Sequence, residues 1–136
     1  MASGALMAAV AARLAANWTR CAIVEDDTTG LGPSDGSPYV TIEYPVARED
    51  QITIGAPGNN VFRETGAFRL VLVSDMGQGR TQPIAWIDEL RALFRSKNFD
   101  HVTTFAPSPG VVDTSNYRAG KFVVSSSVPY YIDLFA

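Results

Sequence analysis

Apolar and polar residues alternate most regularly in the segment 60–75, near the middle of the chain. An alternation with a period of two residues is typical of a β-strand, whose successive side chains point to opposite faces of the sheet. Apolar residues occur on both faces of this segment, with Phe68, Leu70 and Leu72 on one face and Val71 and Val73 on the other. The pattern predicts a central strand that is covered on both faces. Gly66, within the strand, predicts a bulge or a change in the direction of the sheet.

A helical period follows and predicts a helix from about Pro83. Its apolar face comprises Ile84, Ile87, Leu90 and Phe94, flanked by Trp86 and Leu93. Proline is tolerated in a first helical turn, where its missing N–H has no intrahelical partner, and Thr81 is a candidate N-cap. Asp88 and Arg91 are spaced to form an ion pair on the solvent side of this helix.

Another helix is predicted near the N-terminus, because apolar residues recur there every four positions. These residues are Leu6, Val10, Leu14 and Trp18. Ser3 is a candidate N-cap. The run is rich in alanine, but it lacks the basic stretch that precedes the apolar core of a signal peptide, and Arg13 interrupts it. It is also too short to span a bilayer, so we expect no membrane partner.

Two further segments precede the central strand. Residues 39–44 alternate, and Pro45 either ends that strand or places it at an edge of the sheet. Residues 48–60 predict a β-ribbon or an extended loop that projects from the sheet. Within them, residues 51–54 predict a short strand, and the Gly-, Pro- and Asn-rich residues 55–60 predict a turn.

The remaining strands follow the second helix. Residues 101–106 predict a strand, residues 107–110 a turn, and residues 117–135 the last strand or strands, in which Pro129 bends or ends the ladder. This order of elements predicts an α+β fold with a mostly antiparallel sheet, on which an N-terminal helix and a central helix pack. We expect a single domain over residues 1–136.

Composition and charge narrow the functional classes. A hydrophobic content of 46% and a charged content of 18% are ordinary for a globular protein. The net charge of −3 argues against a general nucleic-acid-binding protein, which normally carries a basic excess. The single cysteine, Cys21, cannot form an internal disulfide and lies in an apolar run, which favours a buried thiol over a nucleophile.

No catalytic, cofactor-binding or metal-binding constellation is predicted. The segment 32–36 matches G-x-S-x-G but lacks the preceding strand and following helix of a nucleophile elbow. Gly77-Gln78-Gly79 lies between a strand and a helix, where a phosphate loop would lie, but Gln82 stands in place of the third glycine. His101 is the only histidine, so a site with several histidine ligands is excluded.

Taken whole, the chain resembles the tail-terminator (tail-completion) proteins of long-tailed bacteriophages, of the lambda type. The resemblance covers nearly the whole length and consists of a series of segments. These are ALMAAVAARL, YVTIEY, QITIG running into NNVFRETG, VLVS joined by GQG to IDELRALFR, and VPYYIDLF. None of these segments is a catalytic signature.

The resemblance implies a structural virion protein and not an enzyme. It implies an α+β subunit that forms a ring, usually a hexamer, at the head-proximal end of the tail tube. The ring would end tube polymerisation and provide the docking surface for the head connector, and genomic DNA would pass through its lumen without sequence-specific binding. The expected location is the neck or tail of the virion, after assembly in the host cytoplasm.

A ring of identical subunits needs contacts that use two different surface patches. The candidate contact region is the 48–60 projection together with the start of the central strand, because these segments mix charged and apolar residues. The residues singled out are Arg48, Glu49, Asp50, Gln51, Asn59, Asn60, Phe62, Arg63 and Glu64. The alternative interpretation of the projection is a plain mobile loop.

Other functions stay open at this point. One is another head–tail joining or neck protein of similar size. A second, from a different class, is a small phosphate- or nucleotide-binding enzyme that uses the Gly77-Gln78-Gly79 turn. A third is a ligand-binding accessory domain of a larger assembly.

Overall fold

A computed structural model describes residues 2–24, 37–75, 81–112 and 121–136. The elements are α1 (Gly4–Asn17), β1 (Ala22–Ile23), β2 (Tyr39–Gln51), β3 (Val61–Asp75), α2 (Thr81–Phe94), β4 (Asn98–Phe99), β5 (Val102–Thr104), β6 (Val111–Val112) and β7 (Lys121–Phe135). One mixed sheet has the strand order β1-β2-β3-β7-β5-β4, and β6 also pairs with β7. Only β1 and β2 pair in parallel among the described strands. The predicted α+β fold is confirmed.

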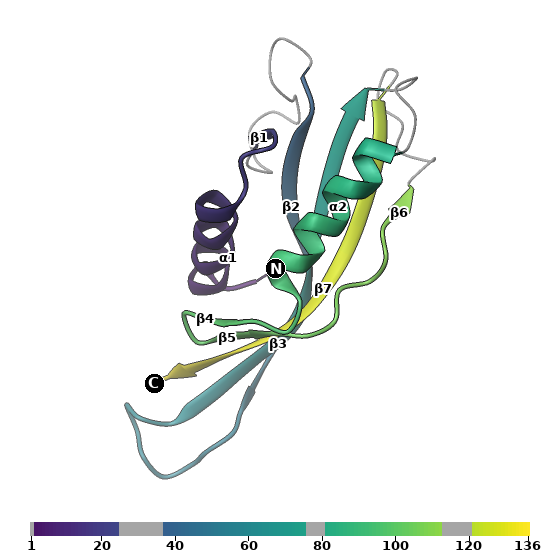
Figure 1. Cartoon of the computed structure of the whole chain (residues 1–136). Coiled ribbons are helices and arrows are strands. Elements are labelled where there is room, and N and C mark those ends of the chain that lie inside the picture. The colour runs from purple at the N-terminus through teal and green to yellow at the C-terminus, as the bar shows by residue number, and fades with distance from the viewer. Residues whose placement is uncertain (1, 25–36, 76–80, 113–120) are drawn as a thin grey trace.

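The hydrophobic core lies between the sheet and the two helices (Figure 1). Alternate residues of β3 and β7 point into it, and Phe68 stacks edge to face on Phe94 of α2, with ring centroids 5.1 Å apart. The residues predicted to form the apolar faces of the helices supply the rest: Leu6, Val10 and Leu14 of α1, and Ile87 and Leu90 of α2, are all fully buried. Burying such side chains is the main term that stabilises the fold.

The helices also contact one another beside the sheet. Trp18, just after α1, meets Trp86 of α2 in a T-shaped arrangement with ring centroids 6.1 Å apart. The Arg13 Nε donates a hydrogen bond to the Leu93 carbonyl oxygen at 2.8 Å. Ser3 caps α1 as predicted, since its hydroxyl accepts from the Leu6 N–H. The α2 helix begins two residues before Pro83, so Thr81 is its first residue.

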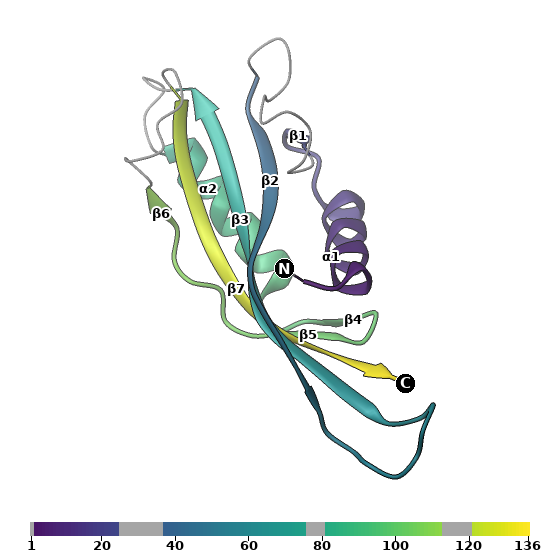
Figure 2. The ribbon, with the colours of Figure 1, turned by 180° about the vertical axis from the view of Figure 1, so that it is seen from behind.

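A β-bulge on β2 lies where the backbone of β2 approaches Gly66 of β3 closely. Glu43 pairs with Arg69, but the next pair is Val46 with Ala67, so two residues of β2 oppose one residue of β3. A Cβ at Gly66 would lie 2.1 Å from the Val46 carbonyl oxygen. Gly66 is therefore required by close packing, and the bulge predicted near it lies on the partner strand. The strands bend in this region (Figure 2).

The two prolines in strands do not end them. β2 continues through Pro45, where it is an edge strand because β1 pairs only with Tyr39 and Val40. β7 continues through Pro129, whose carbonyl oxygen accepts from the Phe105 N–H at 3.0 Å. The carbonyl and the nitrogen of a strand residue point to the same side, so Pro129 costs no hydrogen bond with β3.

Other predictions of local structure were wrong. Residues 52–54 form no strand, because the N–H groups of Ile52 and Thr53 both point at the Val61 carbonyl oxygen and the ladder stops there. Residues 107–110 form no turn, because this segment runs along β7, to which the Ser108 N–H donates. β4 was not predicted, and it forms a hairpin with β5.

The two faces of the sheet differ in cover. Among the described residues, both helices pack on one face, and none packs on the other (Figures 1 and 2). On this helix-free face a smaller cluster buries Tyr39, Val71, Val73 and Val123. The central strand is thus buried on both faces there, as predicted, although the described helices cover only one of them.

Candidate assembly surface

Residues 48–65 form a β-ribbon that extends from the body of the molecule (Figure 1). They comprise the end of β2, the loop 52–60 and the start of β3, and we call them the ribbon. The ladder between β2 and β3 continues to the pair Gln51–Phe62, and β7 runs along the other side of β3 as far as Phe135. The prediction of a β-ribbon is confirmed.

The loop of the ribbon is held by hydrogen bonds from its own side chains. The Asn60 Oδ1 accepts from the Ala56 N–H at 3.1 Å, and the Thr53 hydroxyl oxygen accepts from the Val61 N–H at 2.8 Å. The backbone of Asn60 pairs in both directions with Ala136, at 2.9 Å each. Gly55 and Gly58 have positive φ angles, which glycine adopts without strain. These bonds give the loop a defined shape.

The outer part of the ribbon is uncharged and exposes apolar side chains. Every residue from Gln51 to Asn59 is exposed, and none of them is charged. Ile52 and Ile54 are 52% and 89% exposed. Leaving an isoleucine in water forgoes about 1.5–3 kcal/mol relative to burying it. Two such residues at the end of a projection are typical of a contact surface.

The nine residues singled out from the sequence divide into two groups. Arg48, Glu49, Asp50, Gln51 and Asn59 are exposed, and Phe62 and Arg63 are partly exposed. Asn60 and Glu64 are buried, and their side chains bond within the subunit. The first group is available to a neighbour, and the proposal of a subunit contact rests on it.

Glu64 has an internal role that the sequence reasoning missed. Its carboxylate accepts a hydrogen bond from the Tyr130 hydroxyl at 2.7 Å and from the Ser3 N–H at 3.3 Å. Burial, together with the bond to Glu64, raises the pKa of Tyr130. Glu64 therefore ties the residue that caps α1 to β3 and β7. Strand alternation puts Glu64 on the same face as Phe68, so its inward direction could have been read from the sequence.

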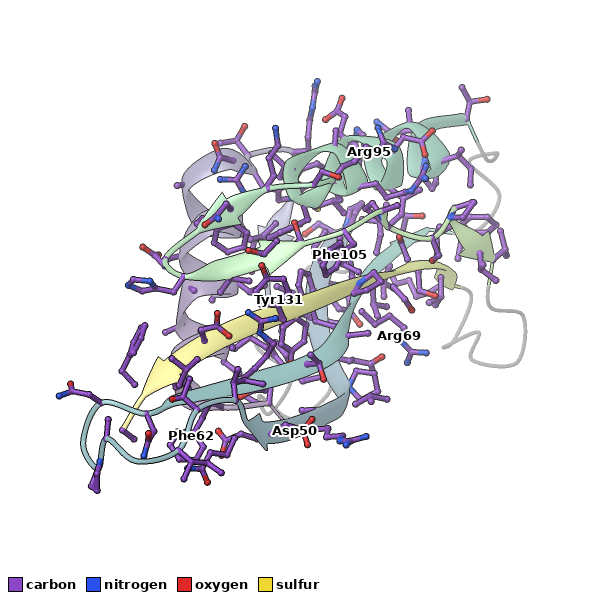
Figure 3. The ribbon with its side chains drawn as sticks, turned by 90° about the horizontal axis from the view of Figure 1, so that it is seen from below. Asp50, Phe62, Arg69, Arg95, Phe105 and Tyr131 are labelled. Carbon is purple, nitrogen blue, oxygen red and sulfur yellow. The ribbon has the colours of Figure 1, made fainter. Side chains whose placement is uncertain are left out.

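Planar side chains stack on the helix-free face beside the ribbon (Figure 3). Arg63 donates two hydrogen bonds to the Asp133 carboxylate, at 2.8 and 3.0 Å. These bonds hold the pKa of Asp133 below its usual value. The Arg63 guanidinium lies 4.2 Å from the Tyr131 ring centroid, and Tyr131 lies 5.8 Å from Phe105. No sequence pattern indicated this stack, because its members come from three separate strands or segments.

The residues considered for chemistry do not form a site. The Cys21 thiol is half-buried and accepts from the Trp18 Nε1–H, and burial raises its pKa, which disfavours the reactive thiolate. His101 is exposed in the hairpin turn between β4 and β5. The described residues hold no group of three or more metal-ligating side chains. The segments 32–36 and 77–79 lie outside the described residues.

Neither helix in the described part of the chain has the length and apolar character needed to cross a bilayer.

A ribbon that exposes apolar side chains, beside a sheet face on which no described helix packs, is typical of the class of structural proteins that work through contact surfaces. Comparison with known proteins identifies the family. Residues 5–130 match the model of the phage tail terminator protein family, so the chain belongs to that family. It is accordingly a non-enzymatic structural component of the phage tail and hence of the virion, and the nucleotide-binding enzyme considered from the sequence is wrong.

A solved structure whose name states no function supports the fold assignment. The match between the two structures covers 100% of this chain and 99% of the other chain, with a TM-score of 0.60 and 17% sequence identity. At that identity the likeness concerns the fold alone. The search of curated proteins found no match.

Proposed function

We propose that this protein forms a ring, a hexamer, that caps the head-proximal end of the tail tube. The ring ends tube polymerisation at the correct length and offers its other face to the head connector. The observation that carries the proposal is the match of residues 5–130 to the tail terminator family. The genome would pass through the lumen, and a net charge of −3 suits a channel that should not retain DNA.

The ribbon supports this proposal as one of the two patches that a ring contact requires. Its shape is set by hydrogen bonds within the loop, so it loses little conformational freedom when it docks. Its apolar end supplies the dehydrated centre of a contact, and the Arg48–Asp50 pair, at 3.1 Å, supplies part of a polar rim. A plain surface loop would lack the first of these properties.

The test measures polymerisation of the cognate tail tube protein with and without this chain. Light scattering and negative-stain imaging should show rings of about six copies at tube ends, and tubes that stop growing. Ile54→Asp puts a charge at the most exposed of the large apolar residues that the structure describes, and should abolish capping without changing the melting temperature. Ile23→Asp, at another exposed apolar residue outside the ribbon, is the matched control and should cap normally.

Two results would contradict the proposal. A chain that stays monomeric beside growing tubes is not a terminator. A chain that binds the head connector but leaves tube growth unchanged acts instead as a joining or neck protein.

A further inference from the structure

A row of uncharged, mostly apolar side chains crosses the helix-free face of the sheet. Val46 of β2 pairs with Ala67 of β3, which pairs with Pro129 of β7. The next chain segment continues the line, because the Phe105 N–H bonds the Pro129 carbonyl oxygen and the Phe105 ring lies on Tyr131. We call Val46, Ala67, Pro129 and Phe105 the apolar row. Val46 and Phe105 are 59% and 47% exposed, so nothing in the described subunit covers its two ends.

Ion pairs border the apolar row on both sides along the strands. On one side Glu43 pairs with Arg69, and these residues are themselves register partners in β2 and β3. On the other side Arg63 pairs with Asp133 across β3 and β7. Arg69 and Tyr131, both labelled in Figure 3, lie on the same face, one on each side of the apolar row along the strands. An apolar centre between charges that are already neutralised is the composition of a protein contact, since docking there isolates none of these charges.

The end of the ribbon has the matching chemistry. It is uncharged from Gln51 to Asn59 and carries Ile52 and Ile54, so it brings apolar surface and no net charge to a contact. It cannot reach the apolar row of its own subunit. Val61 lies six residues from Ala67 along β3, or roughly 20 Å at about 3.3 Å per residue, and pairing on both sides keeps β3 extended.

We propose that the end of the ribbon of one copy docks on the apolar row of the next copy. The contact is head to tail, because the two patches are different and lie at separate places on each subunit. Such a contact closes into a ring when the rotation between copies permits. This inference deepens the proposed ring, names the two surfaces that join, and rests on that proposal.

Engineered cysteines test the contact in the full chain. Ile54→Cys and Val46→Cys are combined in a Cys21→Ala background, which removes the natural thiol. Both new cysteines are at exposed positions, so the melting temperature should stay within a few degrees of the parent. Oxidation should then give a ladder of bands at multiples of 14.6 kDa, ending at the size of the ring.

Controls separate a head-to-tail contact from chance collision. Each single-cysteine variant alone should give no ladder, whereas a mixture of the Ile54→Cys and Val46→Cys variants should give one dimer band. Ile54→Cys combined with Ile23→Cys, at an exposed residue of β1 outside the apolar row, should crosslink at least tenfold less.

The outcomes distinguish this inference from the proposed function. Rings that form normally but give no Ile54–Val46 ladder overturn the docking site and leave the ring intact. A ladder equal in strength for the Ile23 control also overturns it. A chain that forms neither rings nor crosslinks at any concentration overturns both proposals.

Discussion

The strands β2 and β3 run through both the body of the molecule and the ribbon, but the two regions use them in opposite ways. In the body, successive side chains of β2 and β3 point alternately into the core under the helices and into a smaller buried cluster on the other face. In the ribbon, exposed residues predominate, and hydrogen bonds and ion pairs hold the shape. The change falls where the bulge of β2 meets Gly66. One hairpin thus contributes to the core at one end and exposes uncharged, partly apolar residues at the other.

Truncating the core should have the largest effect and should act on folding alone. Phe68→Ala removes a fully buried ring that packs on Phe94 and Tyr130. We expect a loss of about 3–5 kcal/mol in the free energy of unfolding, measured by urea denaturation. At temperatures where the variant stays folded, it should still form rings. A folded Phe68→Ala variant that formed none would show that body and ribbon are not separable.

Gly66, where the body meets the ribbon, should be the next most sensitive position to substitution. Gly66→Ala puts a methyl group against the Val46 carbonyl oxygen and the Ala47 backbone. Because backbone atoms cannot move aside as a side chain does, we expect a loss of roughly 1–3 kcal/mol, and a ribbon displaced from its normal direction. Ring formation should therefore fall even where the variant is folded. Gly58→Ala, in the loop of the ribbon, is the comparison. Its added methyl group meets nothing within 4 Å, so any loss of stability there comes from its positive φ and not from a clash. A Gly66→Ala variant as stable as its parent would contradict the close approach described here.

The bond between α1 and the start of the ribbon can be tested at Glu64. Glu64→Ala leaves the buried Tyr130 hydroxyl and the Ser3 N–H without their acceptor, which should cost about 1–3 kcal/mol in thermal or chemical unfolding. Glu49 is the matched control, because it is the register partner of Glu64 but is exposed. Glu49→Ala should change stability by less than about 0.5 kcal/mol. Equal effects of the two substitutions would refute the internal role of Glu64.

The smallest effect should come from the Arg63–Asp133 pair. The folded-state pKa of Asp133 is lowered from 3.8 by the hydrogen bonds from Arg63. A lowered pKa means stability that is present above 3.8 and is lost as the pH falls through the folded-state value. Asp133→Asn should therefore be less stable than the parent by about 0.2–1 kcal/mol at pH 7. The difference should disappear in acid, as unfolding curves at pH 7 and near pH 2 would show. A difference that persisted in acid would point to packing and not to charge.

Elements whose formation depends on burial could be predicted from the sequence. The two helices and the central strand follow from the spacing of residues such as Leu6, Ile87 and Leu70, because each pattern reports one buried face. A bulge was predicted at Gly66, but its place on β2 could not be, since it depends on the register between two strands. The segment 107–110 was misjudged because Pro107 and Pro109 are as compatible with an extended chain as with a turn.

The candidate contact surface was predicted only in part. The projection from Arg48 to Asn60 was visible from its composition. The apolar row was not, because Val46 and Ala67 become neighbours through the pairing of β2 with β3, and Phe105 joins them only through Pro129 of β7. A surface made by one continuous segment can be predicted from the sequence, whereas a surface made by several strands can be predicted only when the strand order and register are known.

The ribbon begins beyond the bulge beside Gly66, so its length can change without a change in the core. Side chains of a strand alternate with a period of two, so adding two residues to each strand of the ribbon keeps every side chain on its face. Adding one residue to each strand would turn the ribbon over and point Ile54 to the opposite side. Insertions of two residues per strand would lengthen the ribbon by roughly 7 Å per step while the core keeps its register. The reach of the ribbon can thus evolve, or be engineered, independently of the core.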